Sequence, residues 1–187
     1  MVQSRGLGDV YKRQLLDDGM FGLSEISKLV QSLKNFARLD RQSTENIDIH
    51  DCIESSLTIA SNAIKEHDVT IQREFGDLPT IECAPSKLNQ LFLNIITNAC
   101  QAMRDTHGPL TVRTAVEGPE IRVDFIDQGT GMDEETQKKM FDPFYTTKEI
   151  GQGTGMGMSI AYKIIEEHNG RIEVSSELNQ GTTVSIF

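Results

Sequence analysis

The chain has 187 residues, of which 37% are hydrophobic and 25% charged, and its 28 acidic and 18 basic residues give a net charge of −10. That length allows one ordinary domain with an appendage, and a domain of this size can bury a core without disulfides or metal. A chain this acidic is poorly suited to non-specific binding of DNA or of anionic membranes. We therefore expect no nucleic-acid partner and no membrane contact.

The three cysteines, Cys52, Cys83 and Cys100, have neither the spacing of a disulfide framework nor that of a metal site. We expect them to be small buried hydrophobic side chains in a reducing compartment. No apolar run approaches the roughly 20 residues of a membrane span, and no signal peptide is visible. These features predict a cytoplasmic location, whether or not the intact protein is anchored upstream.

Residues 1–14 show no periodicity and mix glycine, serine and charged side chains, so we expect a non-native leader. Residues 15–42 form the next unit, with an amphipathic helix predicted over 15–40. Its apolar residues recur every three or four positions: Leu23, Ile26, Leu29, Val30, Leu33, Phe36 and Ala37. A single apolar stripe needs a partner, so we expect this helix to pack in a coiled coil or bundle, or to fold back onto the domain.

Residues 43–187 form the main unit, in which strands and helices mix without strict alternation. Alternating or apolar runs predict strands over 46–50, 69–75, 80–83, 110–116, 121–126, 171–176 and 182–187. Helical periodicity and capping signals predict helices over 51–66, 85–103, 133–140 and from residue 157 to about 167. This order indicates an α+β fold, a two-layer α/β sandwich in which helices cover one face of a mixed sheet.

The helix predicted over 85–103 has no charged residue from position 88 onward. Neutral amides follow the edge of its apolar arc, at Gln90, Asn94, Asn98 and Gln101. Asn94 and Asn98 are one turn apart, so their oxygens can point at the same ligand. Amide oxygens are hard ligands that suit Mg²⁺. A buried amide network that is satisfied internally explains the pattern equally well.

The segment Asp127-Gln-Gly129-Thr-Gly131 follows the strand predicted over 121–126. A carboxylate at a strand end can accept a hydrogen bond from the amino group of a ligand, and two glycines let a flat ring approach the backbone. The same D-x-G-x-G pattern is also ordinary turn chemistry. By itself this motif therefore leaves both readings open.

The run Gly151-Gln-Gly153-Thr-Gly155-Met-Gly157 leads directly into a predicted helix. Its backbone N–H groups could wrap a polyphosphate at the helix N-terminus. The run is not a Walker A loop, and a flexible linker is disfavoured because an amphipathic helix begins inside it. Before the run, Phe141 and Phe144 are expected to anchor a mobile segment, and Lys148 is the nearby cation that suits phosphate.

Four motifs follow one another along the chain: N-x-x-x-N-A, D-x-G-x-G, F-x-P-F and G-x-G-x-G-x-G. Together with Gly181-Thr-Thr, they resemble the N, G1, F, G2 and G3 boxes of sensor histidine kinases. The resemblance covers about residues 45–187. It implies a Bergerat (GHKL-type) sandwich over 43–187 that binds ATP and Mg²⁺, with a lid between residues 132 and 157.

The resemblance also implies roles for single residues. Asp127 would bind the adenine amino group, Asn98 would hold Mg²⁺, and Asn94 would orient the phosphates or act near the transferred phosphoryl group. Lys148 would contact the phosphates and serve in catalysis. The remaining nucleotide contacts would come from Gly129, Gly131, Gly151, Gly153, Thr154, Gly155, Met156, Gly157 and either Thr182 or Thr183, near the adenine.

The helix over 15–40 resembles the second helix of the family's dimerisation and phosphoacceptor domain. This implies a homodimer in the intact protein and a response-regulator receiver domain as partner. The first helix, which carries the acceptor histidine, is absent, and His50 lacks the following proline and lies in the first predicted strand. His67 and His107 are expected in loops and His168 at a helix end.

We therefore expect this fragment to bind ATP without phosphorylating itself. The alternatives are an ATPase of the same fold, which would carry a glutamate where this chain has Asn94, and a non-catalytic, anti-sigma-like nucleotide-binding module.

Overall fold

The computed structural model describes residues 14–16, 19–20, 22–23, 44–106, 108–149 and 153–187. Nearly all of the expected leader and most of the helix predicted over 15–40 lie outside the described residues. The described residues between 14 and 23 are helical. In the part of the chain that is described, no helix combines the length and apolar character needed to cross a membrane.

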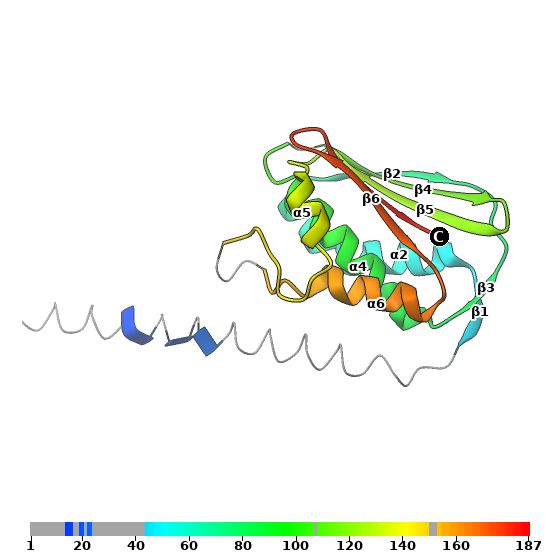
Figure 1. The fold of residues 1–187 in the computed structure, drawn as a ribbon, viewed down its shortest axis with the longest axis horizontal. Helices are drawn as coiled ribbons and strands as arrows, with labels where there is room; N and C mark the ends of the chain where they lie inside the picture. Colours follow the sequence, from blue (N-terminus) through cyan, green and yellow to red (C-terminus); the bar gives the residue numbers. More distant parts are fainter. Residues whose placement is uncertain (1–13, 17–18, 21, 24–43, 107, 150–152) are drawn as a thin grey trace, which may run out of the picture.

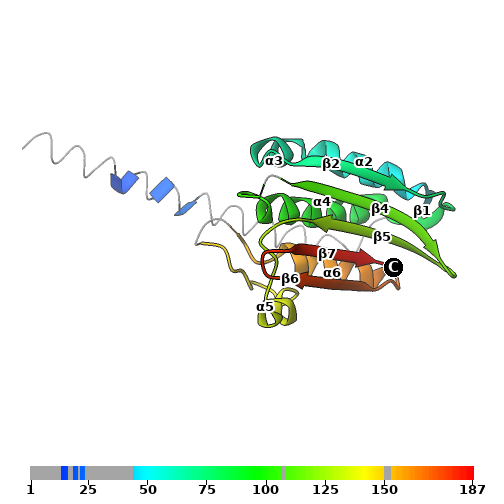
Figure 2. The same ribbon diagram turned by 90° about the horizontal axis from the view of Figure 1, so that it is seen from above.

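Five strands form one twisted sheet in the order β2-β4-β5-β7-β6 (Figure 2). They are β2 (Thr70–Phe75), β4 (Pro109–Glu117), β5 (Glu120–Asp127), β7 (Gly181–Ile186) and β6 (Ile172–Glu177). β2 and β4 are parallel, whereas the other neighbours are antiparallel. The predicted mixed sheet is therefore confirmed.

Three longer helices, α2 (Ile49–Ile59), α4 (Pro85–Ala102) and α6 (Gly157–Glu167), lie along one face of this sheet (Figure 1). The central helix α4 packs against both of the others. Its apolar arc is buried as predicted, through Leu88, Leu91, Phe92, Ile95, Ile96, Ala99 and Met103. Burial of this arc against the sheet is a main source of stability, at about 25 cal/mol for each Å² of apolar surface removed from water.

The N-terminal part of the main unit differs from the expectation. The strand predicted over 46–50 stops at β1 (Glu45–Ile47), because Asp48 caps α2 and its carboxylate accepts a hydrogen bond from the His50 N–H at 2.9 Å. His50 therefore lies in the first turn of a helix, and its placement in a strand was wrong. β1 pairs with β3 (Ile81–Cys83) in a separate two-stranded sheet that the sequence pattern did not distinguish.

The helix predicted over 51–66 is divided at Ala60 into α2 and α3 (Ser61–Glu66). Ala60 has a ψ angle of 0°, which is outside the α-helical range, although its N–H still bonds to the Ser56 carbonyl at 2.9 Å. The three cysteines are free and buried, as expected.

The remaining short helix, α5 (Glu134–Lys139), begins at Asp133, whose side chain accepts from the Thr136 N–H. It follows the end of β5 and leads into the segment that precedes α6. In both ribbon views α5 lies toward one end of the sheet, away from β1 and β3 (Figures 1 and 2). The end of β5, the edge of α4 and the start of α6 consequently meet around one cavity.

Candidate functional site

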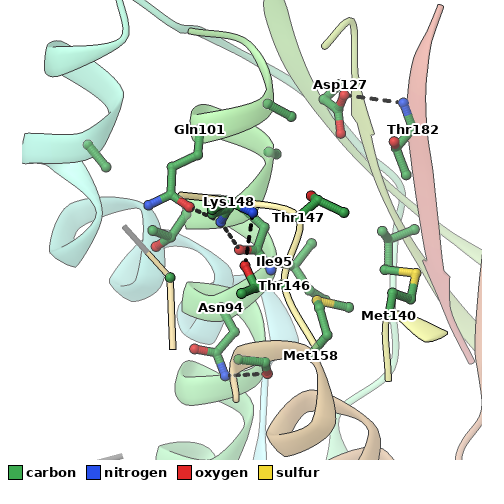
Figure 3. Close-up of a pocket in the computed structure, with 18 of the residues that line it drawn as sticks. Asn94, Ile95, Gln101, Asp127, Met140, Thr146, Thr147, Lys148, Met158 and Thr182 are labelled. Carbon is green, nitrogen blue, oxygen red and sulfur yellow. Dashed lines mark hydrogen bonds between the residues drawn. The ribbon is translucent and has the colours of Figure 1, made fainter. Parts of the chain in front are cut away.

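A cavity of about 870 Å³ is lined by α4, the end of β5, β7, the segment that joins α5 to α6 and the start of α6, and also by the end of α2 and by α3. It brings together residues that are widely separated in the sequence (Figure 3). Ten of the predicted site residues line it: Asn94, Asn98, Asp127, Gly131, Lys148, Gly153, Thr154, Gly155, Gly157 and Thr182.

Two other predicted residues, Gly129 and Met156, do not line the cavity. A Cβ atom on Gly129 would lie 2.7 Å from the Ala102 backbone, so this glycine is needed for close packing of the loop against α4. Met156 is 3% exposed and belongs to the hydrophobic core. Gly151 lies outside the described residues.

Asp127 is the last residue of β5 and is only 7% exposed. Its Oδ1 atom accepts a hydrogen bond from the Gly129 N–H at 2.9 Å. It also accepts one from the Thr182 N–H at 3.2 Å (Figure 3). Burial raises the pKa of this carboxyl group, and the two backbone hydrogen bonds oppose the rise. The side chain is thus held rigidly at the sheet side of the cavity.

Apolar side chains line the cavity between the sheet and α4. They include Ile95, Ala99, Phe125, Met140, Met158 and Val184. Such a surface can cover the faces of a flat aromatic ring, and a carboxylate at its end can accept a hydrogen bond from a polar ring edge. Sequence reasoning did not identify Met140 and Met158, which come from α5's C-terminal end and from α6, and no local pattern marks them.

A cluster of polar groups lies on the α4 side of the cavity. Asn94 donates from Nδ2 to the Gly157 carbonyl oxygen at 3.0 Å, which ties α4 to the start of α6. The Lys148 ammonium donates to Asn98 Oδ1 at 3.1 Å and also to Gln101 Oε1 (Figure 3). Burial lowers the pKa of Lys148. Among the described residues that line the cavity, Lys148 is the only lysine or arginine.

The predicted anchoring role of the two phenylalanines is confirmed for only one side chain. Phe141 packs on the core, and its ring centroid is 5.3 Å from that of Tyr162 on α6. The Phe144 side chain is 60% exposed, so the expectation that it anchors the segment was wrong.

The Phe144 backbone makes the attachment instead. Its N–H donates to the Gly155 carbonyl oxygen at 2.9 Å, and both residues have positive φ angles of 68° and 65°. A Cβ atom on Gly155 would lie 2.3 Å from the Phe144 carbonyl carbon. Glycine is therefore required at this position for the two chain segments to meet.

Thr146 and Thr147 also line the cavity, next to Lys148. A Cβ atom on Gly153 would lie 2.9 Å from Thr146 Oγ1, so the glycine run packs closely against this segment. Both threonines were missed in the sequence, although their position beside Lys148 was an available signal. The cavity thus combines an apolar slot ending in a carboxylate with a group of amides, hydroxyls and one ammonium.

Comparison with known proteins agrees with this arrangement. Residues 83–187 match the family described as "Histidine kinase-, DNA gyrase B-, and HSP90-like ATPase". Sporulation kinase E of Bacillus subtilis (strain 168) is 43% identical over 110 residues, which is 59% of this chain and 15% of the relative. Sensor histidine kinase ZraS of Escherichia coli (strain K12) is 28% identical over 163 residues, which is 87% of this chain and 34% of the relative.

Solved structures give the same result for the fold. The catalytic domain of histidine kinase ThkA has a TM-score of 0.67 and 26% identity, covering 78% of this chain and 94% of that domain. Full-length ShkA in complex with AMPPNP has a TM-score of 0.74 and 23% identity, covering all of this chain (100%) and 39% of ShkA. The predicted Bergerat-type sandwich is therefore confirmed.

The chain spans 15% of the length of Sporulation kinase E and 34% of that of ZraS, so it corresponds to one part of these relatives. The matched region contains α4, β5, the glycine run and β7, which supply most of the residues that line the cavity, while the end of α2 and α3 line it from outside the matched region. The chain belongs to the family of histidine kinase-, DNA gyrase B- and HSP90-like ATPases, and within it the chain is the ATP-binding catalytic part of a sensor histidine kinase.

Proposed function

We propose that this domain transfers the γ-phosphoryl group of ATP to a histidine on a helical dimerisation domain, from which it passes to an aspartate of a response-regulator receiver domain. The observation that carries the proposal is the pairing, in one cavity, of a buried carboxylate at the sheet side with the Asn98–Lys148 contact at the helix side. A nucleotide needs recognition at both its base and its phosphates, and these two groups supply it.

At the base end, Asp127 accepts a hydrogen bond from the adenine amino group. Its Oδ1 atom is already engaged by two backbone N–H groups, and none of the described residues donates to Oδ2. Oδ2 is therefore the oxygen available to a ligand. The ring lies in the apolar slot between α4 and the sheet, with Thr182 beside it and Gly131 at the loop.

At the phosphate end, the backbone N–H groups of residues 153–157 bind the phosphates at the N-terminus of α6, where the helix dipole favours negative charge. Lys148 contributes positive charge, since no other lysine or arginine is among the described residues that line the cavity. Asn94 is oriented by its bond to the Gly157 carbonyl, and it lies beside the start of this helix, where it directs the terminal phosphate.

Mg²⁺ fits the donor set on α4. Asn98 Oδ1 is a hard, neutral oxygen that already accepts a hydrogen bond from a cationic group, so it is directed at a position suited to positive charge. When bound there, Mg²⁺ would neutralise charge on the phosphates. The protein's own contribution is to hold Asn98 and Asn94 one turn apart on a buried helix.

Phosphoryl transfer depends mainly on positioning and on neutralisation of charge. Hydrolysis would need a group that accepts a proton from water, and an amide such as Asn94 cannot do so. The amide side chain of Asn94 therefore favours transfer to a histidine over hydrolysis.

We propose that none of the chain's histidines is the phosphoryl acceptor. His50 contacts Asp48 through Nδ1 and Thr114 through Nε2, and its ring stacks on Phe75. His168 makes a hydrogen bond through Nδ1 to the Ile164 carbonyl oxygen, and its Nε2 accepts a hydrogen bond from the Ala84 N–H. His67 caps α3, and His107 lies outside the described residues.

The acceptor is thus supplied by a separate helix. We also propose that the intact protein forms a homodimer through the helix over 15–40. In this proposal the domain boundaries lie at 14/15 and 42/43.

The test combines the chain with a separately produced dimerisation hairpin that carries an acceptor histidine, in the presence of Mg²⁺ and ATP labelled at the γ-phosphate. We expect acid-labile, base-stable label on the hairpin and none on the chain alone. Replacing the hairpin histidine with alanine is the control and should abolish labelling. Fast ATP turnover without any acceptor would instead favour an ATPase. Nucleotide binding with neither activity would favour a non-catalytic module.

A further inference from the structure

Gln101 makes a contact that the assigned roles do not explain. It lies three residues after Asn98 on α4, and its Oε1 atom accepts a hydrogen bond from the Lys148 ammonium. The same ammonium donates to Asn98 Oδ1 at 3.1 Å. Figure 3 shows Lys148 reaching α4 from the segment before the glycine run, with its nitrogen directed at the Gln101 side chain. One cation is thus held by two amide oxygens of one helix face.

The chemistry of this contact is that of a cation site. Amide oxygens are neutral acceptors, and both lie on the wall of the cavity in which the phosphates are proposed to bind. Asn98 Oδ1 is also the oxygen proposed for Mg²⁺. An ammonium and a divalent cation repel each other at such short range, so the two cannot use this oxygen at the same time.

We propose that Gln101 is a positioning residue that, together with Asn98, holds Lys148 as a place-holding cation at the metal site. Without metal, the ammonium stays between the two amides and faces the phosphates of a bound nucleotide. With metal, Lys148 gives up Asn98 and keeps Gln101, which leaves it beside the same phosphates. This inference rests on the proposed function of Asn98.

Among the described residues, the Lys148 ammonium donates to two neutral amide oxygens, those of Asn98 and Gln101. Contact with Gln101 also explains the neutral side chain at this position. A glutamate there would repel the phosphates, and an apolar side chain would leave the buried ammonium with one acceptor fewer.

The experiment measures AMPPNP affinity by calorimetry on the full chain, once with Mg²⁺ and once with EDTA. The quantity compared between variants is the Kd with EDTA divided by the Kd with Mg²⁺. Lys148→Met removes the place-holding cation, so metal-free affinity should fall roughly tenfold or more while affinity with Mg²⁺ changes less. The ratio should therefore rise. Gln101→Met should raise the same ratio by roughly threefold or more, because the ammonium loses one of the two acceptors that the described residues supply.

Gln90→Met is the matched control, because Gln90 lies on α4 and does not line the cavity. It should leave both affinities unchanged. A purely structural role for Gln101 would change the two affinities by the same factor, and that result would overturn the inference. Thermal denaturation of each variant shows whether a change in affinity comes from loss of folding.

A second readout is independent of affinity. In ¹⁵N-lysine-labelled protein without metal, the Lys148 ammonium resonance, identified by its absence in Lys148→Met, should exchange slowly with water. Exchange should be faster in Gln101→Met. An ammonium that exchanges as fast as surface lysines in the unsubstituted chain would overturn the inference.

The two proposals fail in different ways. If Mg²⁺ does not change AMPPNP affinity in the unsubstituted chain, the metal role of Asn98 fails and the place-holding role fails with it. If Mg²⁺ tightens binding but Gln101→Met has the same ratio as the unsubstituted chain, only the place-holding role fails.

Discussion

Replacement of Asp127 by asparagine gives the sharpest test of the nucleotide site. In the structure, Oδ1 accepts from two backbone N–H groups, those of Gly129 and Thr182. An asparagine must keep its single oxygen on these donors, because turning the amide over would leave both of them unpaired. Its NH₂ group then faces the cavity, where the adenine amino group also donates. Two donors meet, and the hydrogen bond to the ligand is lost.

The magnitude follows from this geometry. A hydrogen bond to an ionised acceptor contributes about 1.5–3 kcal/mol, which corresponds to a change of about 10- to 150-fold in Kd. Desolvation of the unpaired donors adds to the loss. We therefore expect Asp127→Asn to weaken AMPPNP binding at least about tenfold, as measured by calorimetry.

Asp124→Asn is the control for this measurement. Asp124 is 3% exposed on the same strand, pairs with Arg122 at 2.8 Å and accepts from the Ser185 hydroxyl at 2.6 Å, and it does not line the cavity. This variant should keep its nucleotide affinity even if its stability falls. An Asp127→Asn affinity within threefold of the unsubstituted chain would refute the assignment of adenine to this carboxylate.

Three further predictions concern metal dependence, pH and backbone geometry. Asn98→Ala should abolish the effect of Mg²⁺ on AMPPNP affinity, and retained metal dependence in calorimetry would contradict the proposed ligand. Burial raises the pKa of Asp127 in the folded state, so protonation of this group favours folding. The unsubstituted chain should therefore gain stability relative to Asp127→Asn as pH falls from about 7 towards 4. Urea unfolding at several pH values measures this difference in the free energy of unfolding, and a difference that shrinks as pH falls would contradict the prediction. Gly155→Ala would place a Cβ 2.3 Å from the Phe144 carbonyl carbon at a φ of 65°, and should speed proteolysis around residue 144 and weaken nucleotide binding. Unchanged binding in that variant would show that this backbone contact does not support the site.

Much of the site could be predicted because its signals are local. A spacing of four residues on a helix puts Asn94 and Asn98 on one face, and the absence of charge beside them indicates partial burial. A carboxylate directly after a strand lies at the strand's end wherever the sheet is. The glycine run before α6 is likewise local, since it concerns the backbone of consecutive residues.

Some predictions were wrong because two local rules compete for the same residues. Residues 46–50 alternate like a strand, yet Asp48 can also cap a helix, and the capping hydrogen bond to the His50 N–H prevails. Phe144 was expected to be an anchor because it is large and apolar. Its positive φ lets the backbone N–H reach Gly155, while the side chain remains 60% exposed. Neither outcome is apparent from composition alone.

The sequence by itself determined the order of the elements, the mixed sheet with helices on one face, and the residue types able to bind a nucleotide, since these follow from periodicity and from neighbours along the chain. Only the tertiary structure decided that Met140 and Met158 complete the apolar slot and that Lys148 reaches Gln101, 47 residues away. Such contacts depend on how α4 packs between the sheet and the segment after α5. Packing of distant side chains leaves no periodic trace in the sequence, so it is fixed only when the whole core assembles.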